Sequence, residues 1–253
     1  MPLVVGNWKM ELSHKAAVAL AKSLKSDVEE HRPVCEIVVC PSFPSLSQVS
    51  EVLKGTPLNC GAQDVSAQEK GALTGQVSVT QLGAFVSWCI VGHSETRTYA
   101  GDSDRLVAQK AELLLRHGLT PIVCIGETED ERHADETVAK IGSQIQSLLA
   151  VLPRVAFLKT IIAYEPIWAI GSGFSPQPDD VAEIMLLIRK MTQHRFDTPA
   201  AQRLRILYGG SVKPENVAQY VGGPYADGVL VGGASVHAGQ FFDIIKEVEQ
   251  SFT

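Results

Sequence analysis

Short, continuously apolar runs alternate with longer amphipathic stretches along the whole chain. The apolar runs occupy residues 3–5, 37–40, 58–61, 89–91, 121–125, 161–163, 205–208 and 228–231. Amphipathic stretches with a helical period occupy, among others, residues 13–28, 103–117, 136–152 and 178–195. Because the apolar runs have the length of strands and the amphipathic stretches that of helices, the pattern predicts eight strand and helix units.

The spacing of these units predicts how they are arranged. Successive strands lie about 30 residues apart, which is the length of one βαβ step. Helix start signals stand at Ser13, at Ser42 ahead of Pro44, and at Ser103. Continuously apolar strands are typical of a parallel sheet covered by helices, and no Gly-x-Gly-x-x-Gly follows the first strand, as an open dinucleotide-binding sheet would require. The sequence therefore predicts one α/β domain over residues 1–253, a single (β/α)8 barrel with its active site at the C-terminal ends of the strands.

Composition and charge limit the kinds of molecule that this protein is expected to bind. The chain has 253 residues, of which 45% are hydrophobic, so it is long enough for one substantial core. Its formal net charge is −6 and no Lys/Arg-dense run is present, which excludes the electrostatic pattern of proteins that bind nucleic acid or anionic membranes. Neither a signal peptide nor an apolar stretch of roughly 20 residues is found. We therefore expect a soluble, cytoplasmic protein.

The cysteines give no sign of a disulfide framework or a metal site. They are odd in number, lack Cys-x-x-Cys spacing and mostly lie in apolar, strand-like runs: Cys35, Cys40, Cys60, Cys89 and Cys124. This usage is typical of buried, reduced thiols.

A lone carboxylate, Glu165, stands where the sixth apolar run ends. The loop that follows begins with Pro166 and contains Gly171 and Gly173. Pro166 favours extended geometry at Glu165, and the glycines allow backbone N–H groups to approach an anion. The pattern predicts a catalytic base followed by a lid over a substrate, whereas the alternative is an ordinary loop with a solvated glutamate.

Polar residues and paired glycines follow the ends of other strands. They are Asn7 and Lys9 after the first, His93 after the fourth, Gly209, Gly210 and Ser211 after the seventh, and Gly232 and Gly233 after the eighth. Taken singly, a solvated lysine, a structural histidine and tight turns are the alternatives. Together, two Gly-Gly turns at the end of a barrel predict a backbone phosphate site. A base, a neutral donor, a fixed cation and a phosphate site suit proton transfer next to a carbonyl, with no metal, flavin or nicotinamide signature.

Motifs from end to end of the chain carry a family resemblance. They are Gly6-Asn7-Trp8-Lys9-Met10, Gly61-Ala62-Gln63, Gly71 with Thr74-Gly75, Val91-Gly92-His93-Ser94-Glu95, Cys124-Ile125-Gly126-Glu127, Tyr164-Glu165-Pro166 through Gly173, Tyr208-Gly209-Gly210-Ser211 and Leu230-Val231-Gly232-Gly233-Ala234-Ser235. In this order and spacing, the chain resembles the triosephosphate isomerase family. The resemblance implies a TIM barrel that interconverts dihydroxyacetone phosphate and D-glyceraldehyde 3-phosphate in glycolysis and gluconeogenesis, without a cofactor.

The resemblance also implies residue roles. Glu165 is expected to be the base, His93 a neutral electrophile, and Asn7 and Lys9 substrate binders, while Glu95 interacts with Lys9 or relays protons. Phosphate binding is expected from Gly171, Ser211, Gly232 and Gly233. The loop from Gln63 to Gln76 matches the one that inserts into the partner subunit of a homodimer.

Several positions depart from the family pattern. Glu11 and Asp64 stand where Asn is common, Gln76 and Asp102 where Glu is common, and Thr96 where Arg is common; the segment 174–176 is Phe-Ser-Pro instead of a Lys-Thr-Ala type. No catalytic group is lost, so these departures affect subunit contacts and the lid hinge. At positions 76 and 96 the family commonly has Glu and Arg, two residues of opposite charge, and in this chain both charges are absent. Since Gln76 lies on the loop expected to reach the partner subunit, we hypothesise that Gln76 and Thr96 meet across a dimer interface.

Two other functions are compatible with a barrel. A class I aldolase would need Lys9 as a Schiff-base lysine held uncharged by burial, and Glu95 nearby argues against this. A binding or scaffold protein could share the fold, since fold does not fix function. The intact set Asn7, Lys9, His93 and Glu165 argues against that alternative.

Overall fold

A closed parallel barrel forms the centre of the molecule. The computed structural model describes residues 1–170 and 175–253. Over these residues eight strands pair in chain order, and the last pairs with the first. They are β1 (Leu3–Asn7), β2 (Glu36–Cys40), β3 (Leu58–Ala62), β4 (Trp88–Val91), β5 (Thr120–Ile125), β6 (Ile161–Tyr164), β7 (Arg205–Tyr208) and β8 (Gly228–Val231). The predicted (β/α)8 barrel is confirmed.

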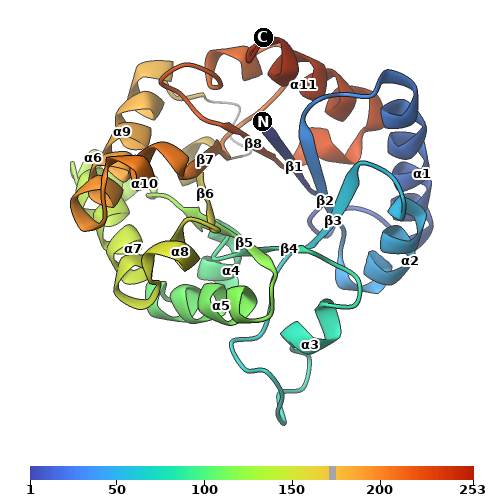
Figure 1. Ribbon diagram of the computed structural model, residues 1–253, viewed down its shortest axis with the longest axis horizontal. Helices are drawn as coiled ribbons and strands as arrows, with labels where there is room; N and C mark the ends of the chain where they lie inside the picture. Colours follow the sequence, from blue (N-terminus) through green and yellow to red (C-terminus); the bar gives the residue numbers. More distant parts are fainter. Residues whose placement is uncertain (171–174) are drawn as a thin grey trace.

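Helices surround the strands on the outside (Figure 1). The longer ones are α1 (His14–His31), α2 (Phe43–Leu53), α5 (Asp104–Arg116), α7 (Thr137–Val151), α9 (Pro178–Arg195) and α11 (Ala238–Gln250). The shorter ones are α3 (Val79–Leu82), α4 (Ser94–Tyr99), α6 (Glu129–His133), α8 (Arg154–Phe157) and α10 (Thr198–Arg203), with 3-10 turns at Ile167–Ala169, Val217–Gln219 and Gly233–Val236. Ser13 and Ser103 accept backbone N–H groups as N-caps, whereas Ser42 caps α2 without a side-chain bond.

The alternation of side chains along each strand divides the core into two layers. Leu3 and Val5 point into the barrel, where they pack with residues such as Ile90 and Leu207. Val4, which lies between them in sequence, belongs to the larger layer between sheet and helices. Because the middle of most strands is apolar and buried, the polar groups near the barrel axis lie mainly at the ends of the strands.

The predicted strand boundaries agree with the structure to within two residues. The largest difference is an extension at the functional end, since β1 continues by two residues to Asn7. All five cysteines are free and buried, as expected from their apolar surroundings. Among the described helices, none is both long and apolar enough to cross a membrane.

Candidate active site

Glu165 is held at the C-terminal end of β6 by very close backbone packing. Its N–H donates to the Ile125 carbonyl at 2.7 Å, and the residue is only 2% exposed. A Cβ atom at Gly126 would lie 1.8 Å from the Glu165 carbonyl oxygen, and one at Gly209 would lie 2.8 Å from its Cγ. Glycine is therefore required on both sides of this carboxylate, which explains two glycines of the sequence motifs.

His93 is aimed into the same space by a turn at the end of β4. Gly92 adopts φ 67°, which favours glycine, and His93 is then the N-cap of α4. Its Nδ1 atom accepts the backbone N–H of Glu95 at 3.2 Å. Because Nδ1 is an acceptor in this contact, the ring proton is assigned to Nε2, which faces Glu165.

The Glu165 carboxylate is bound on two sides in this structure. Its Oε1 atom lies 3.1 Å from His93 Nε2, and its Oε2 atom accepts the Ser94 N–H at 3.3 Å. Burial is the largest single influence and lowers the pKa of His93, but the charge of Glu165, its hydrogen bond to the ring and the charge of Glu95 together raise this pKa above its ordinary value. Lys9 opposes this rise.

We expect an NMR titration of His93 to show how burial and Glu165 act on its pKa in opposite directions. The pKa of His93 should lie above 6.5 in the unliganded protein and should be lower in Glu165→Gln, because burial and Lys9 then act without the opposing carboxylate. Glu127→Gln is the matched control, since the Glu127 carboxylate does not contact His93. A His93 pKa that is equal in the wild type and in Glu165→Gln would show that Glu165 does not control this imidazole.

Lys9 supplies the positive charge beside this pair. Its Nζ atom lies 2.6 Å from Glu95 Oε1. Its backbone has φ 48°, an unfavourable value for a residue with a side chain, and its N–H donates to Asn7 Oδ1 at 3.1 Å. Lys9 and Glu95 are therefore in direct contact, as the family resemblance led us to expect.

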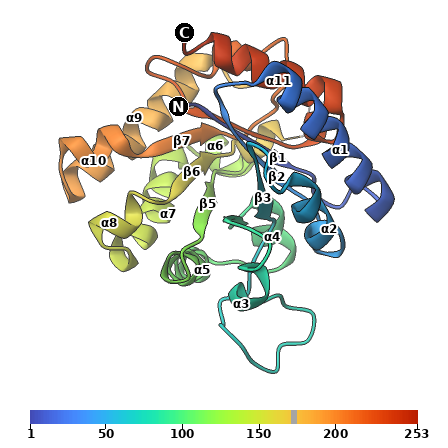
Figure 2. The ribbon, with the colours of Figure 1, turned by 45° about the vertical axis from the view of Figure 1, so that its right-hand side comes forward.

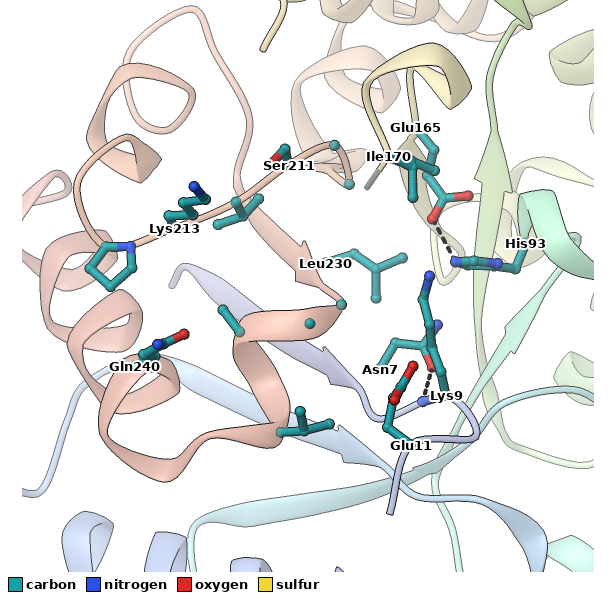
Figure 3. A pocket seen from close by; sticks show the side chains of 18 of the residues that line it. Asn7, Lys9, Glu11, His93, Glu165, Ile170, Ser211, Lys213, Leu230 and Gln240 are labelled. Atoms are coloured by element: carbon teal, nitrogen blue, oxygen red, sulfur yellow. Dashed lines mark hydrogen bonds and ion pairs between the residues drawn. The ribbon is translucent and has the colours of Figure 1, made fainter. Parts of the chain in front are cut away.

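These groups share a cavity of about 570 Å³. Figure 3 shows Glu165 and His93 facing each other near Lys9 and Asn7, with Lys213 and Gln240 at the far side. The cavity is lined by Asn7, Lys9, Glu11, His93, Glu165, Ile170, Gly209, Gly210, Ser211, Val212, Lys213, Pro214, Glu215, Leu230, Gly232, Gly233, Ala234, Val236 and Gln240. Backbone N–H groups at the 3-10 turn Gly233–Val236 suit an anion.

A second buried carboxylate holds the start of the loop after Glu165. Glu127 Oε1 accepts the Trp168 indole N–H at 2.9 Å and the Tyr164 hydroxyl at 3.1 Å. The Glu127 carbonyl also accepts the Ile167 N–H at 3.1 Å. Burial raises the pKa of Glu127. The loop therefore leaves β6 from a fixed position beside the base.

The cavity brings together most of the predicted site residues. Asn7, Lys9, His93, Glu165, Ser211, Gly232 and Gly233 all line it. Glu95 does not line it and instead contacts Lys9 and His93 from behind. Gly171, like most of the predicted lid tip, lies outside the described residues.

Other residues at the site had no sequence signal of their own. Gln63, assigned only to the partner-facing loop, donates through its amide to the carbonyls of Lys9 and Cys40, at 2.8 and 2.9 Å. The Ser94 N–H that binds Glu165 is a backbone group, which sequence does not reveal. Lys213 and Gln240 are isolated polar residues whose position depends on how the last two units close the barrel.

Comparisons with known proteins agree with this geometry. Residues 2–248 match the family model described as triosephosphate isomerase. The chain is 42% identical over 254 residues to the triosephosphate isomerase of Cutibacterium acnes, covering 98% of both chains. It is 44% identical over 253 residues to that of Coxiella burnetii, covering 99% of this chain and 98% of the relative. It is 45% identical over 245 residues to that of Bordetella pertussis, covering 96% and 95%. The chain therefore belongs to the triosephosphate isomerase family.

Proposed function

We propose that this chain interconverts dihydroxyacetone phosphate and D-glyceraldehyde 3-phosphate by proton transfer through an enediolate, in glycolysis and gluconeogenesis and in the cytoplasm. The observation that carries the proposal is the contact of 3.1 Å between Glu165 Oε1 and His93 Nε2 inside a cavity that also contains Lys9. Residues 1–253 act as one domain, because the barrel strands extend from Leu3 to Val231.

The phosphate of the substrate binds at the glycine turns. Ser211, Gly232 and Gly233 line the cavity and offer backbone N–H groups to the anion. The expected contribution of Gly171 falls on a residue outside the described part of the chain. Lys9 attracts the dianion from within a chain of formal net charge −6, which has no general attraction for anions. Asn7 fixes the Lys9 backbone by accepting its N–H.

Proton transfer takes place at the opposite end of the cavity. The substrate carbonyl oxygen takes the place of Glu165 as the acceptor of the His93 Nε2–H. Glu165 then leaves the Ser94 N–H and removes the proton from the carbon next to the carbonyl. His93 and Lys9 stabilise the negative charge that develops on the oxygen, while Glu95 holds both of them in place.

A coupled assay tests this function directly. Purified protein without added metal should convert glyceraldehyde 3-phosphate to dihydroxyacetone phosphate, followed through a reductase that consumes the ketone. Borohydride added with the ketose phosphate should trap no covalent adduct. Trapping on Lys9 in the absence of isomerisation would instead support an aldolase.

The same proposal includes a homodimer formed through the loop from Gln63 to Gln76. Residues 68–76 are all exposed, and Figure 2 shows the segment between β3 and α3 extending away from the barrel. Large hydrophobic side chains are exposed at Met10 (94%), Leu73 (41%) and Tyr99 (86%). Burial of such residues against a second copy would remove apolar surface from water.

We expect the two uncharged departures to be coupled in this dimer. Thr96→Arg alone should weaken association, because it buries an unpaired charge, which commonly costs about 3–5 kcal/mol. Adding Gln76→Glu should restore much of the loss. Sedimentation of both single variants and the double variant measures the coupling. Because the Thr96 hydroxyl also donates to the His93 carbonyl at 3.0 Å, Thr96→Val serves as the control for loss of that bond. Strictly additive effects would show that the two positions do not face each other.

A further inference from the structure

A buried ammonium group outside the substrate cavity is shared by two carboxylates. Lys110 on α5 is 4% exposed, and its Nζ atom lies 2.8 Å from Asp64 Oδ1 and 2.8 Å from both Asp102 oxygens. Asp102 is itself buried. Asp64 and Asp102 are two of the positions at which this chain departs from the family pattern, and the structure shows that both departures meet at one lysine.

The pairing makes this cluster rigid. Removing charges from water is unfavourable unless each is paired with good geometry, so a buried lysine strongly restrains the carboxylates around it. Burial raises the pKa of Asp64 although Lys110 opposes the rise. Lys110 thus ties the start of the loop after β3, where Asp64 lies, to helix α5 and to the segment that precedes α5.

Gln63 connects this cluster to the substrate-binding Lys9. Gln63 directly precedes Asp64, and its amide donates to the carbonyl of Lys9 at 2.8 Å and to that of Cys40 at 2.9 Å. Lys9 needs such support, because its φ of 48° lies in the left-handed region. A displacement of Gln63 would therefore release the Lys9 backbone and shift the ammonium that faces the substrate.

We propose that Asp64 is a positioning residue for Lys9, acting through Gln63, and that Lys110 and Asp102 hold Asp64 in place. This role rests on the proposed function, in which Lys9 binds the substrate. The shorter side chain of Asp102 and the added carboxylate of Asp64 together surround one ammonium. Gln63 and Asp64, which do not line the substrate cavity, thereby connect Lys9 in the cavity with the loop expected to contact a partner subunit.

Asp64→Ala tests the proposal, with Asp64→Asn as the conservative variant. Asp64→Ala should raise KM and lower kcat/KM by about tenfold or more, because small displacements of positioned groups have effects of this size. The inhibition constant of inorganic phosphate should rise with KM. Asp64→Asn keeps an acceptor for the Lys110 ammonium and should retain KM within about twofold of the wild type, a smaller change than loss of the contact causes.

Glu69→Ala is the matched control. Glu69 lies on the same loop and also contacts the end of α5, through His117 at 3.1 Å and Arg116 at 3.6 Å, but it does not adjoin Gln63. It should alter Tm without altering KM. All variants are compared at protein concentrations where sedimentation gives equal mass, so that loss of a dimer cannot imitate loss of positioning.

The outcomes separate the two proposals. An inactive wild-type protein would overturn the proposed function itself. If the wild type is active but Asp64→Ala has the same KM as the wild type, the positioning role is overturned. It is also overturned if Glu69→Ala raises KM as much as Asp64→Ala does. If Asp64→Ala does not fold, Gln63→Leu can be used instead, because it removes the hydrogen bonds to the Lys9 and Cys40 carbonyls while the ion cluster stays intact. An unchanged kcat/KM in Gln63→Leu would also overturn the positioning role.

Discussion

Glu165→Gln should lower kcat by roughly two to four orders of magnitude, the usual effect of removing a positioned general base. The amide keeps the size of the side chain and can still accept the Ser94 N–H, so the fold should be preserved. The carboxylate, however, is the group that removes the proton next to the carbonyl. Steady-state kinetics in both directions, with circular dichroism to verify folding, measure this change.

A matched variant distinguishes catalysis from structure. Glu36→Gln changes a carboxylate at the start of β2, where Glu36 pairs with Arg205 at 2.7 Å, at the opposite end of the barrel from the cavity. It should leave kcat close to the wild-type value. Near-normal turnover in Glu165→Gln, or a large fall of its Tm, would identify Glu165 as a structural carboxylate and not as the base.

Lys9→Met should lower kcat/KM by roughly two to three orders of magnitude, comparable to loss of one strong electrostatic contact to a developing oxyanion. Methionine retains most of the apolar stem but neither attracts the phosphate nor stabilises the enediolate. The rate at which the substrate dianion binds should also depend much less on ionic strength, because the positive charge of Lys9 that attracts it is gone. Kinetics at several salt concentrations measure both effects.

Lys213→Met provides the comparison for this variant. Lys213 lines the same cavity, but Figure 3 shows it on the far side from Glu165 and His93. Its loss should weaken the attraction of anions while leaving kcat much less affected than in Lys9→Met. Equal losses in the two variants would contradict a specific role of Lys9 near the reacting carbon.

Much of the architecture could be predicted from the sequence, because the barrel repeats one pattern eight times. Each strand is apolar on both faces and therefore stands out against the helices, and the ends of the strands were predicted to within two residues. The pattern does not predict the short helices α3, α4, α6, α8 and α10, because four to six residues are too few for a helical period to be recognised.

The candidate site was predicted less completely. Residues that directly follow strands, such as Asn7, His93 and Glu165, could be found because a barrel brings all strand ends to one face. The contacts of Gln63 with Lys9, and of Lys110 with Asp64, join segments 54 and 46 residues apart in sequence. Such pairs depend on the register of the barrel and on which polar groups are buried, and neither follows from local pattern.

The lid remains a prediction from the sequence. Tyr164, just before the loop, and Trp168, in its first residues, both donate to Glu127. At the other end of the loop, Tyr220 donates its hydroxyl to the Pro176 carbonyl at 2.9 Å. The residues that would cover the substrate, 171–174, lie outside the described part of the chain.

Isomerisation in deuterium oxide tests the central claim most directly. If Glu165 transfers a proton through an enediolate, dihydroxyacetone phosphate should give glyceraldehyde 3-phosphate that carries solvent deuterium on the carbon next to the carbonyl, because the abstracted proton exchanges with solvent on the base. NMR of the product measures the label, and Glu165→Gln should show almost none in the same time. Rapid isomerisation without any solvent deuterium in the product would contradict the account, since hydrogen would then move without passing through an exchangeable base.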